Sequence, residues 1–255
     1  MDLGIAGETA LVLGGTRGLA LGCARALAEA GVKLLLNGRD PAVGQQAATE
    51  LGGTFVPGDV ADPVERAGVI EAALKHPVSI LVTNAGGPPP GLFTDHPPET
   101  WRKAVELSLL SAIEVTQRLV PGMVARGFGR IVNITSFVVK EPYPNMAISN
   151  SLRVGLVGAM ATLAREVAAR GVTVNNLLPG LMDTGALQRV IDARARRENR
   201  GETEVRQLMA QSVPTGRLGT AADFGPICAF LCSRHAGYIT GQNIAVDGGL
   251  VHGLL

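Results

Sequence analysis

The sequence predicts a single-domain α/β protein: a Rossmann-type, doubly wound sheet of seven mainly parallel strands with helices on both faces. Short apolar runs rich in β-branched residues alternate along the chain with segments of helical length. These runs are continuously apolar, which is typical of parallel strands buried on both faces. A glycine-rich turn also follows the first run and opens the first helix.

The strand candidates come first, each bounded by turn residues or by the next helical segment. They are Thr9–Leu13, Val32–Leu36, Thr54–Val56, Ser79–Thr83, Arg130–Thr135, Val172–Leu178 and Asn243–Val246. The helix candidates between them are Gly18–Ala30, Pro41–Leu51, Pro63–Leu74, Pro98–Arg126, Asn145–Arg170 and Ala221–Ser233, with a further mixed-charge segment near Thr184–Gln211. Strand–helix–strand units of this kind imply parallel strands.

Composition and charge exclude several classes of protein. The 255 residues are 46% hydrophobic and 18% charged, a balance that supports one large core and excludes disordered, collagen-like and coiled-coil chains. No Pro- or Ser-rich linker divides residues 1–255, so we expect one domain. A net charge of +1 gives no field that would attract nucleic acid or an anionic membrane.

The sequence also bears on location and metal content. The longest uncharged stretch, residues 76–94, contains four prolines and cannot form a spanning helix, and the first residues lack a secretory pattern. We therefore expect a cytoplasmic protein without a membrane anchor. The three cysteines cannot all form disulfides within one chain. Cys228, Cys232 and His235 could be drawn as a metal cluster, but a zinc site of this type usually has a second pair of cysteines, which this chain lacks. We therefore expect cysteines buried in the core and no metal site.

The glycine turn is the first candidate site. It reads Leu13-Gly14-Gly15-Thr16-Arg17-Gly18-Leu19-Ala20 and would present backbone N–H groups to a pyrophosphate at the start of a helix. Ligands of such sheets bind outside the carboxyl ends of the strands, where this turn lies. Alone, the turn is a weak signal, and an ordinary strand-to-helix connection is the alternative.

Further motifs carry a resemblance over essentially the whole chain. They are Asp59-Val60, Asn84-Ala85-Gly86, Ile131–Ser136, Pro179-Gly180 with Thr184, and Tyr238–Gln242 with Val246–Gly249. Together with the glycine turn, this pattern resembles the short-chain dehydrogenase/reductase family, and most of all its branch of 3-oxoacyl-(acyl-carrier-protein) reductases. The resemblance implies one dinucleotide-binding and catalytic domain with a lid at about residues 184–211.

The resemblance assigns cofactor contacts by position. It implies that the pyrophosphate and adenosine lie at Gly14, Thr16, Arg17, Gly18 and Leu19, the adenine at Asp59 and Val60, the ribose at Asn84, Ala85 and Gly86, and the nicotinamide carboxamide at Pro179 and Thr184. One departure is Leu13, where the family usually has Thr.

The end of the second strand decides between the two nicotinamide cofactors. NAD-binding forms place a carboxylate there for the ribose 2′-hydroxyl, whereas this chain has Asn37, Gly38 and Arg39. Asp40 precedes Pro41 and is better interpreted as a helix N-cap. Arg17 and Arg39 would together hold a 2′-phosphate, so we predict NADP(H); the alternative is two solvated arginines.

The catalytic positions depart from the family pattern. The family uses an Asn, a Ser and a Tyr-x-x-x-Lys pair, whereas the matching positions here hold Ser108, Ser136, Ser149 and Arg153. Arg153 keeps a cation for the ribose hydroxyls, and Ser136 and Ser149 can polarise a carbonyl. An alcohol is nevertheless a far weaker acid than a phenol, so proton delivery is the missing part.

Two residues between these serines are candidates for the missing proton donor. Tyr143 lies between two prolines and Lys140 precedes it, and the alternatives are a loop-packing ring and a solvated charge. The arginine-rich stretch near residues 189–206 is interleaved with acids and indicates a solvated lid helix, with a docking face for an acidic carrier or a phosphate-bearing thioester as the alternative.

The leading hypothesis is an NADP(H)-dependent oxidoreductase that interconverts a small carbonyl compound and an alcohol by hydride transfer with an altered catalytic set. The alternative is a catalytically impaired NADP-binding protein that acts as a sensor or scaffold. The family resemblance further implies a homotetramer, paired through the long helices Pro98–Arg126 and Asn145–Arg170.

Overall fold

All seven predicted strands join one sheet in the computed structural model, which describes residues 1–253. They are β1 (Thr9–Val12), β2 (Lys33–Gly38), β3 (Thr54–Pro57), β4 (Val78–Asn84), β5 (Gly129–Ile134), β6 (Val172–Pro179) and β7 (Asn243–Val246). Their order is β3-β2-β1-β4-β5-β6-β7, and every pairing is parallel. The predicted fold class is confirmed.

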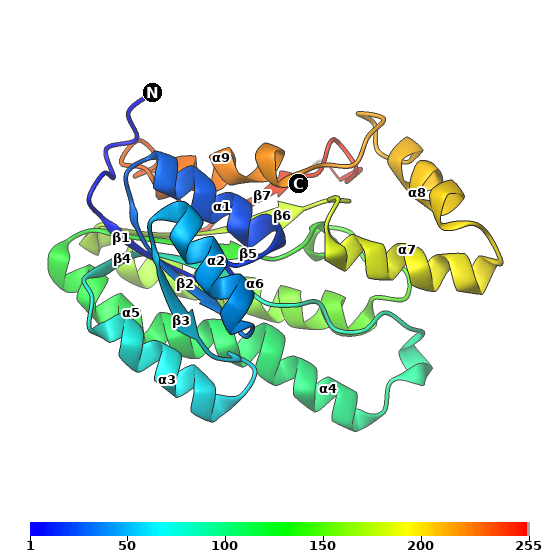
Figure 1. Ribbon diagram of the computed structural model, residues 1–255, viewed down its shortest axis with the longest axis horizontal. Helices are drawn as coiled ribbons and strands as arrows, with labels where there is room; N and C mark the ends of the chain where they lie inside the picture. The colour runs from blue at the N-terminus through cyan, green and yellow to red at the C-terminus, as the bar shows by residue number, and fades with distance from the viewer. Residues whose placement is uncertain (254–255) are drawn as a thin grey trace.

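Helices cover both faces of the sheet (Figure 1). One layer contains α1 (Gly18–Glu29), α2 (Pro41–Leu51) and α9 (Ala221–Cys232), and the other contains α3 (Pro63–Leu74), α5 (Ser111–Arg126) and α6 (Ala147–Val167). Successive strand side chains point to opposite faces, so Leu36 and Ile80 pack with the first layer while Leu11 and Ile131 pack with the second. The sheet therefore separates two apolar cores.

Two predicted helices differ from the observed ones. The segment Pro98–Arg126 is α4 (Pro98–Val105), a π-helical turn η2 (Glu106–Leu110) and then α5. The turn arises because the N–H of Ser111 donates to the carbonyl of Glu106, five residues back. The helix predicted from Asn145 begins at Ala147, because Asn145 has φ 60°, and it ends in a 3₁₀ turn, η4 (Ala168–Arg170).

The segment expected to be a lid is a helical pair beyond the carboxyl edge of the sheet. It consists of α7 (Gly185–Glu198) and α8 (Glu202–Gln211), joined by a left-handed Asn199. Their apolar faces form a small core with Phe137, which lies in the short helix η3 (Phe137–Val139). A second short helix, η1 (Phe93–Asp95), follows β4.

By length and composition alone, one helical stretch, Ala147–Arg170, is long and apolar enough to cross a membrane, since its most apolar window has a mean hydropathy of 1.2. In the fold it lies against the sheet through Leu156, Met160 and Ala164, which are buried. Core helices of this kind pass the same test, so the stretch is weak support for a membrane span.

The three cysteines lie in the apolar core. Cys23, Cys228 and Cys232 are free and buried, in the core that α1 and α9 share. Hydrogen bonds with Cys23 and Cys232, together with burial, raise the pKa of the Cys228 thiol. His235 lies outside this cluster, with Nε2 2.7 Å from the carbonyl oxygen of Asp2. Residues 1–253 contain no group of three or more His, Cys, Asp or Glu side chains placed to hold a metal ion.

Candidate active site

The glycine turn after β1 meets two other predicted cofactor segments. Gly14 has φ 60°, and a Cβ on it would lie 2.8 Å from Asn84 Nδ2, so only glycine allows this approach. A Cβ on Gly18 would lie 3.9 Å from Thr184 Cγ2. The turns after β1, β4 and β6 therefore lie together at the carboxyl edge of the sheet, where such folds bind ligands.

Helix α1 begins without a side-chain cap. Arg17 occupies its N-cap position without capping it, and the first turn contains no acidic residue. By contrast, Asp40 and Asp62 cap α2 and α3 through their carboxylates, as the sequence predicts for Asp40. The first N–H groups of α1 thus keep their capacity to bind an anion, which fits the pyrophosphate of a dinucleotide.

The last two residues of β2, Asn37 and Gly38, make contacts inside the protein and do not face solvent. Asn37 is buried, and its Nδ2 donates to the carbonyls of Val56 and Gly58 at 3.1 and 3.0 Å. A Cβ on Gly38 would lie 2.7 Å from Thr16 Cγ2, so this position requires glycine. Arg39 is consequently the first residue after β2 whose side chain is free to reach solvent.

Both predicted phosphate-binding arginines are exposed and have acidic neighbours. Arg17 Nη2 lies 2.7 Å from Asp40 Oδ2, and Arg39 Nη1 lies 3.5 Å from Asp59 Oδ2. Exposed pairs of this kind contribute about 0–1 kcal/mol each, so a phosphate can displace the carboxylates at small cost. Both arginines can therefore reach a 2′-phosphate, although each is paired with a carboxylate in this structure.

Arg153 joins α6 to the end of β5. Its Nη1 donates to the carbonyls of Thr135 and Ile134 at 2.6 and 3.3 Å, and its Nε donates to Ser149 Oγ at 3.1 Å. Burial lowers the pKa of Arg153 to about 10, which still leaves the guanidinium charged at neutral pH. The cation is thereby held beside the residue that precedes Ser136.

The two serines expected near the reacting carbonyl have different surroundings. Ser149 is buried and accepts the hydrogen bond from Arg153, so its own hydroxyl hydrogen is not needed for that contact. Ser136 begins η3, and its Oγ accepts a long hydrogen bond of 3.4 Å from the N–H of Val138. Both hydroxyls can therefore donate to an additional acceptor.

Ser108 lies in the π-helical turn η2, which packs against α6. The residue is 5% exposed, and within residues 1–253 no partner lies within hydrogen-bonding distance of its Oγ. Leaving a buried hydroxyl without a partner costs about 1–3 kcal/mol, and π-helical turns are frequent at functional sites. The turn thus places a hydroxyl with unused bonding capacity next to the helix that carries Ser149.

The two candidate proton donors lie on the loop before α6. The ring of Tyr143 packs edge-on against Phe137, with 5.4 Å between centroids, and its carbonyl accepts from Asn150 Nδ2. Lys140 follows η3 and forms no ion pair within the described part of the chain. The contacts of Tyr143 fit the loop-packing interpretation, and a role in proton transfer stays a prediction.

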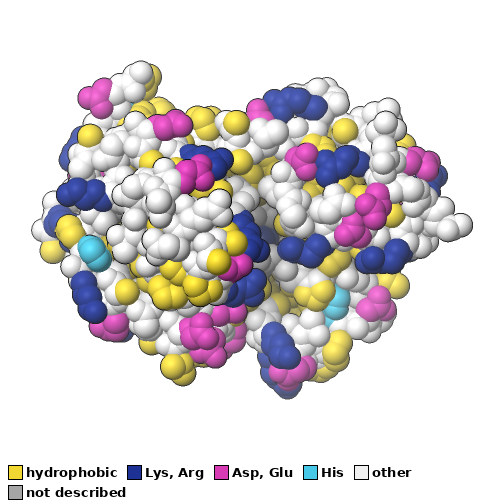
Figure 2. Space-filling view, in the orientation of Figure 1, with side chains coloured by type: hydrophobic (Ala, Val, Ile, Leu, Met, Phe, Trp, Pro, Cys, Tyr) yellow, Lys and Arg dark blue, Asp and Glu magenta, His cyan; other side chains and the backbone are white. Residues whose placement is uncertain are grey.

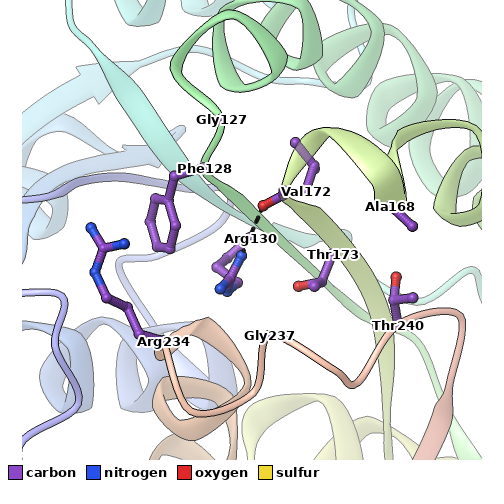
Figure 3. A pocket seen from close by; sticks show the side chains of 10 residues that line it. Gly127, Phe128, Arg130, Ala168, Val172, Thr173, Arg234, Gly237 and Thr240 are labelled. Atoms are coloured by element: carbon purple, nitrogen blue, oxygen red, sulfur yellow. Dashed lines mark hydrogen bonds between the residues drawn. The ribbon is translucent and has the colours of Figure 1, made fainter.

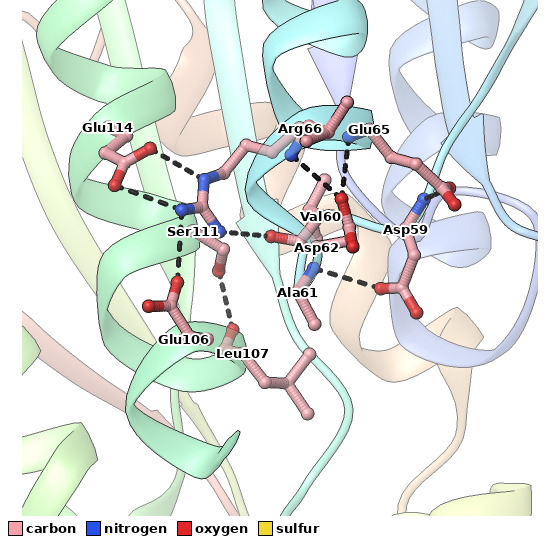
Figure 4. A network of polar contacts seen from close by, with 11 residues as sticks. Asp59, Val60, Ala61, Asp62, Glu65, Arg66, Glu106, Leu107, Ser111 and Glu114 are labelled. Carbon is pink, nitrogen blue, oxygen red and sulfur yellow. Dashed lines mark hydrogen bonds and ion pairs between the residues drawn. The ribbon is translucent and has the colours of Figure 1, made fainter. Parts of the chain in front are cut away.

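A buried arginine that sequence reasoning missed links two parts of the site (Figure 4). Arg66 is 1% exposed, and its Nη1 donates to the carbonyl of Val60 at 2.8 Å. On the other side it binds both carboxylate oxygens of Glu114 at 2.7 and 3.0 Å and Glu106 at 3.1 Å. The loop expected to bind adenine is therefore tied to the π-helical turn that carries Ser108.

A row of buried polar side chains, also missed, crosses the sheet. Thr83 Oγ1 donates to Asn133 Oδ1 at 2.7 Å, Asn133 Nδ2 to Asn176 Oδ1 at 3.0 Å, and Asn176 Nδ2 to Asn243 Oδ1 at 2.8 Å. Satisfied polar networks of this kind specify strand register and add rigidity. The sequence signal for it is the presence of asparagine inside otherwise apolar strands, at Asn133 in β5, Asn176 in β6 and Asn243 in β7.

The arginine-rich stretch near residues 189–206 lies in the α7–α8 segment. Arg194 and Arg197 pair with Glu198, Arg200 pairs with Glu204, and Arg206 pairs with Asp183 at 2.9 Å. This mutual pairing agrees with a solvated, salt-bridged surface. In Figure 2 a hollow divides this view of the molecule, and Lys or Arg side chains lie along it.

Comparison with known proteins agrees with this geometry. A family profile described as "Enoyl-(Acyl carrier protein) reductase" matches residues 14–251. The 3-oxoacyl-(acyl-carrier-protein) reductase of Vibrio cholerae is 32% identical over 252 residues, covering 97% of this chain and 99% of its own length. The dehydrogenase/reductase SDR family member 4 of Sus scrofa is 34% identical, covering 95% of this chain and 86% of its own length.

A comparison with solved structures also finds a relative that matches the whole chain. L-sorbose reductase from Gluconobacter frateurii, in complex with NADPH and L-sorbose, superposes with a TM-score of 0.93 at 29% identity, and all of both chains is covered. The family profile, the relatives and the superposition each span nearly the whole chain. The chain therefore belongs to the short-chain dehydrogenase/reductase family.

Proposed function

We propose that the protein is an NADP(H)-dependent oxidoreductase that interconverts a small carbonyl compound and its alcohol. The observation that carries the proposal is the uncapped start of α1, set between Asn84 and Thr184 at the carboxyl edge of the sheet. Three predicted cofactor segments lie together there, around N–H groups that lack an anionic partner. The sorbose reductase that superposes on the chain was solved with NADPH, which supports the choice of cofactor.

The bound nicotinamide would supply or accept the hydride. Gly14, Thr16, Arg17, Gly18 and Leu19 would hold the phosphates. The adenine would lie at Asp59 and Val60, the ribose at Asn84, Ala85 and Gly86, and the carboxamide at Pro179 and Thr184. Arg39 and Arg17 would exchange their carboxylate partners for the 2′-phosphate, since both are exposed. Residues 184–211 would close over the cofactor as a lid.

In this proposal, Ser149 and Arg153 occupy the positions of the family tyrosine and lysine. Arg153 Nε already donates to Ser149 Oγ, so the Ser149 hydroxyl can direct its hydrogen to a substrate oxygen. Ser136 would donate a second hydrogen bond to the same oxygen and so stabilise developing negative charge. The guanidinium adds a fixed positive charge close by. Neither serine is acidic enough to give up its proton, so Tyr143, Lys140 or solvent must supply it.

The test has two measurements. Titration with NADPH and NADH, followed by nicotinamide fluorescence, should show binding with preference for NADPH. A screen of small ketones, aldehydes and alcohols, followed by nicotinamide absorbance, should then show turnover. Tight NADPH binding without any turnover would instead support the alternative, an NADP-binding sensor or scaffold; absence of binding would contradict both. The cytoplasmic location and the homotetramer remain predictions.

A further inference from the structure

A polar cavity lies at the edge of the sheet opposite the candidate active site, where β5 and β6 begin (Figure 3). It has a volume of about 270 Å³ and is bordered by Phe128, Arg130, Thr173, Arg234 and Thr240. Five residue steps along β5 at about 3.3 Å each place it about 17 Å from the candidate active site. No role in cofactor or substrate binding accounts for it.

Two guanidinium groups share one aromatic ring in this cavity. Arg130 and Arg234 lie on either side of Phe128, with their Cζ atoms 4.4 and 4.5 Å from the ring centroid (Figure 3). Among residues 1–253, Glu8 is the one carboxylate bonded to either of them: its Oε1 accepts from Arg234 at 3.2 Å and its Oε2 accepts from Ser79. Two cations and one anion leave this cluster with a local charge of +1.

In the described part of the chain Arg130 has no carboxylate partner, although it is only 5% exposed. Within residues 1–253 its Nε donates to the carbonyl of Ser233 and its Nη1 to those of Gly129 and Gly171, whereas no acceptor is found for Nη2. Burial is the main cause that lowers the pKa of Arg130, and the charge of Arg234 adds to the effect. The charge of Arg130 is offset by carbonyl dipoles, by the Phe128 ring and by the non-bonded Glu8 rather than by a carboxylate in contact with it. A buried cation without a bonded counter-ion is costly, and an anion in the cavity would relieve that cost.

Thr173 supplies an independent observation. It is 4% exposed, and its Oγ1 is buried without a hydrogen-bond partner in the described part of the chain. Figure 3 shows this hydroxyl on the side of Arg130 that faces away from Arg234. Because Thr173 lines the cavity, its unused hydroxyl is a donor beside Arg130 for a molecule bound there, whereas a valine would fill the same space without one.

We propose that this cavity binds a small oxyanion, a carboxylate or phosphate group, through Arg130 Nη2 and the Thr173 hydroxyl. A cavity of about 270 Å³ exceeds the roughly 30 Å³ that one water occupies, so it can hold such a group with part of the molecule that carries it. Arg234 adds charge at the rim, where its exposure lets it move toward the ligand. The free Nη2 of Arg130 and the Thr173 hydroxyl are two donors, each of which can bond one oxygen of an oxyanion.

The experiment is a thermal-shift titration of the NADPH-saturated protein with inorganic phosphate and, separately, with acetate. Sodium chloride at matched ionic strength is the reference, and NADPH keeps the probes away from the cofactor site. Thr173→Val should weaken binding of the effective probe about fivefold, and Arg130→Lys should weaken it about tenfold or more. Which probe stabilises the wild type distinguishes phosphate from carboxylate.

A matched control separates binding from folding. Thr116 in α5 also has a buried Oγ1 without a partner in residues 1–253, but it does not line the cavity. Thr116→Val and Thr173→Val should raise the melting temperature of the probe-free protein to a similar degree, and only the second should weaken the probe's effect. Repeating the titration without NADPH keeps the result independent of the proposed function. Equal probe affinities in wild type and Thr173→Val, or no shift beyond that of sodium chloride, would overturn the proposal.

Discussion

Arg153 Nε donates to Ser149 Oγ across 3.1 Å, one helical turn apart on α6, while Nη1 of the same guanidinium is fixed by carbonyls at the end of β5. Lysine would carry its charge at a single point, whereas the arginine fork bonds in two directions at once. The pair therefore acts as one unit: the arginine orients the serine, and the serine satisfies one of the arginine's donors.

The first prediction concerns the role of Arg153 in cofactor binding. Arg153→Ala removes the charge and its hydrogen bonds, so NADPH affinity should fall about tenfold to a hundredfold. Arg153→Lys keeps the charge and should retain much of the affinity. Fluorescence titration measures both. Thermal melts of the ligand-free variants provide the control, because Arg153→Ala also leaves Ser149 and two carbonyls without their donor.

The lowered pKa of Arg153 gives a pH-dependence of definite sign. Because burial holds this pKa at about 10, NADPH affinity should decline as the pH rises through about 10. The folded state also releases this proton before the unfolded state does, so the contribution of this group to folding stability should increase with pH above that value. Affinity that stays constant up to pH 11 would show that the guanidinium does not contact the cofactor.

Cofactor choice should respond to the two carboxylates that pair with the arginines. Asp40→Asn keeps a good N-cap for α2 but removes the negative charge from Arg17, so NADPH should bind about two- to fivefold more tightly while NADH is unchanged. Arg39→Asp should erase or reverse the preference. Identical NADPH and NADH titrations in wild type and both variants would contradict the assignment of Arg17 and Arg39.

The Arg66 network should matter for both stability and binding. Arg66→Met fills a similar volume but breaks a buried ionic contact, and we expect a loss of about 3 kcal/mol in the free energy of unfolding, because both glutamates remain partly solvated. NADPH affinity should also fall, since the Val60 carbonyl loses its donor. Exposed Arg118, which pairs with Glu71, is the matched control: Arg118→Met should change neither quantity measurably. Urea unfolding and cofactor titration measure the two effects.

Much of the fold follows from local sequence, and much of the site does not. The apolar runs predicted all seven strands, and Asn243–Val246 has the same bounds in the structure. The π-helical turn at Glu106–Leu110 was missed because its apolar pattern continues that of the helix around it. Arg66 was missed because its partners lie 40 and 48 residues away, and its pairing is a property of the packed layers.

The last prediction concerns proton delivery, where Ser149 stands in place of the family tyrosine. Ser149→Tyr combined with Arg153→Lys should place a phenol beside a lysine that lowers its pKa, and reduction of a generic ketone should rise. Ser108 has unused hydrogen-bonding capacity, so Ser108→Asn in the same background should add a relay group and raise the rate further.

The wild-type donor is tested by two single variants of the loop before α6. If Tyr143 supplies the proton, Tyr143→Phe should reduce turnover about a hundredfold or more and leave NADPH affinity intact, because the ring still packs on Phe137. Lys140→Met gives the same test for the exposed amine. A measured wild-type turnover that survives both changes would exclude both residues, and solvent that reaches Ser149 would then be the remaining source of the proton.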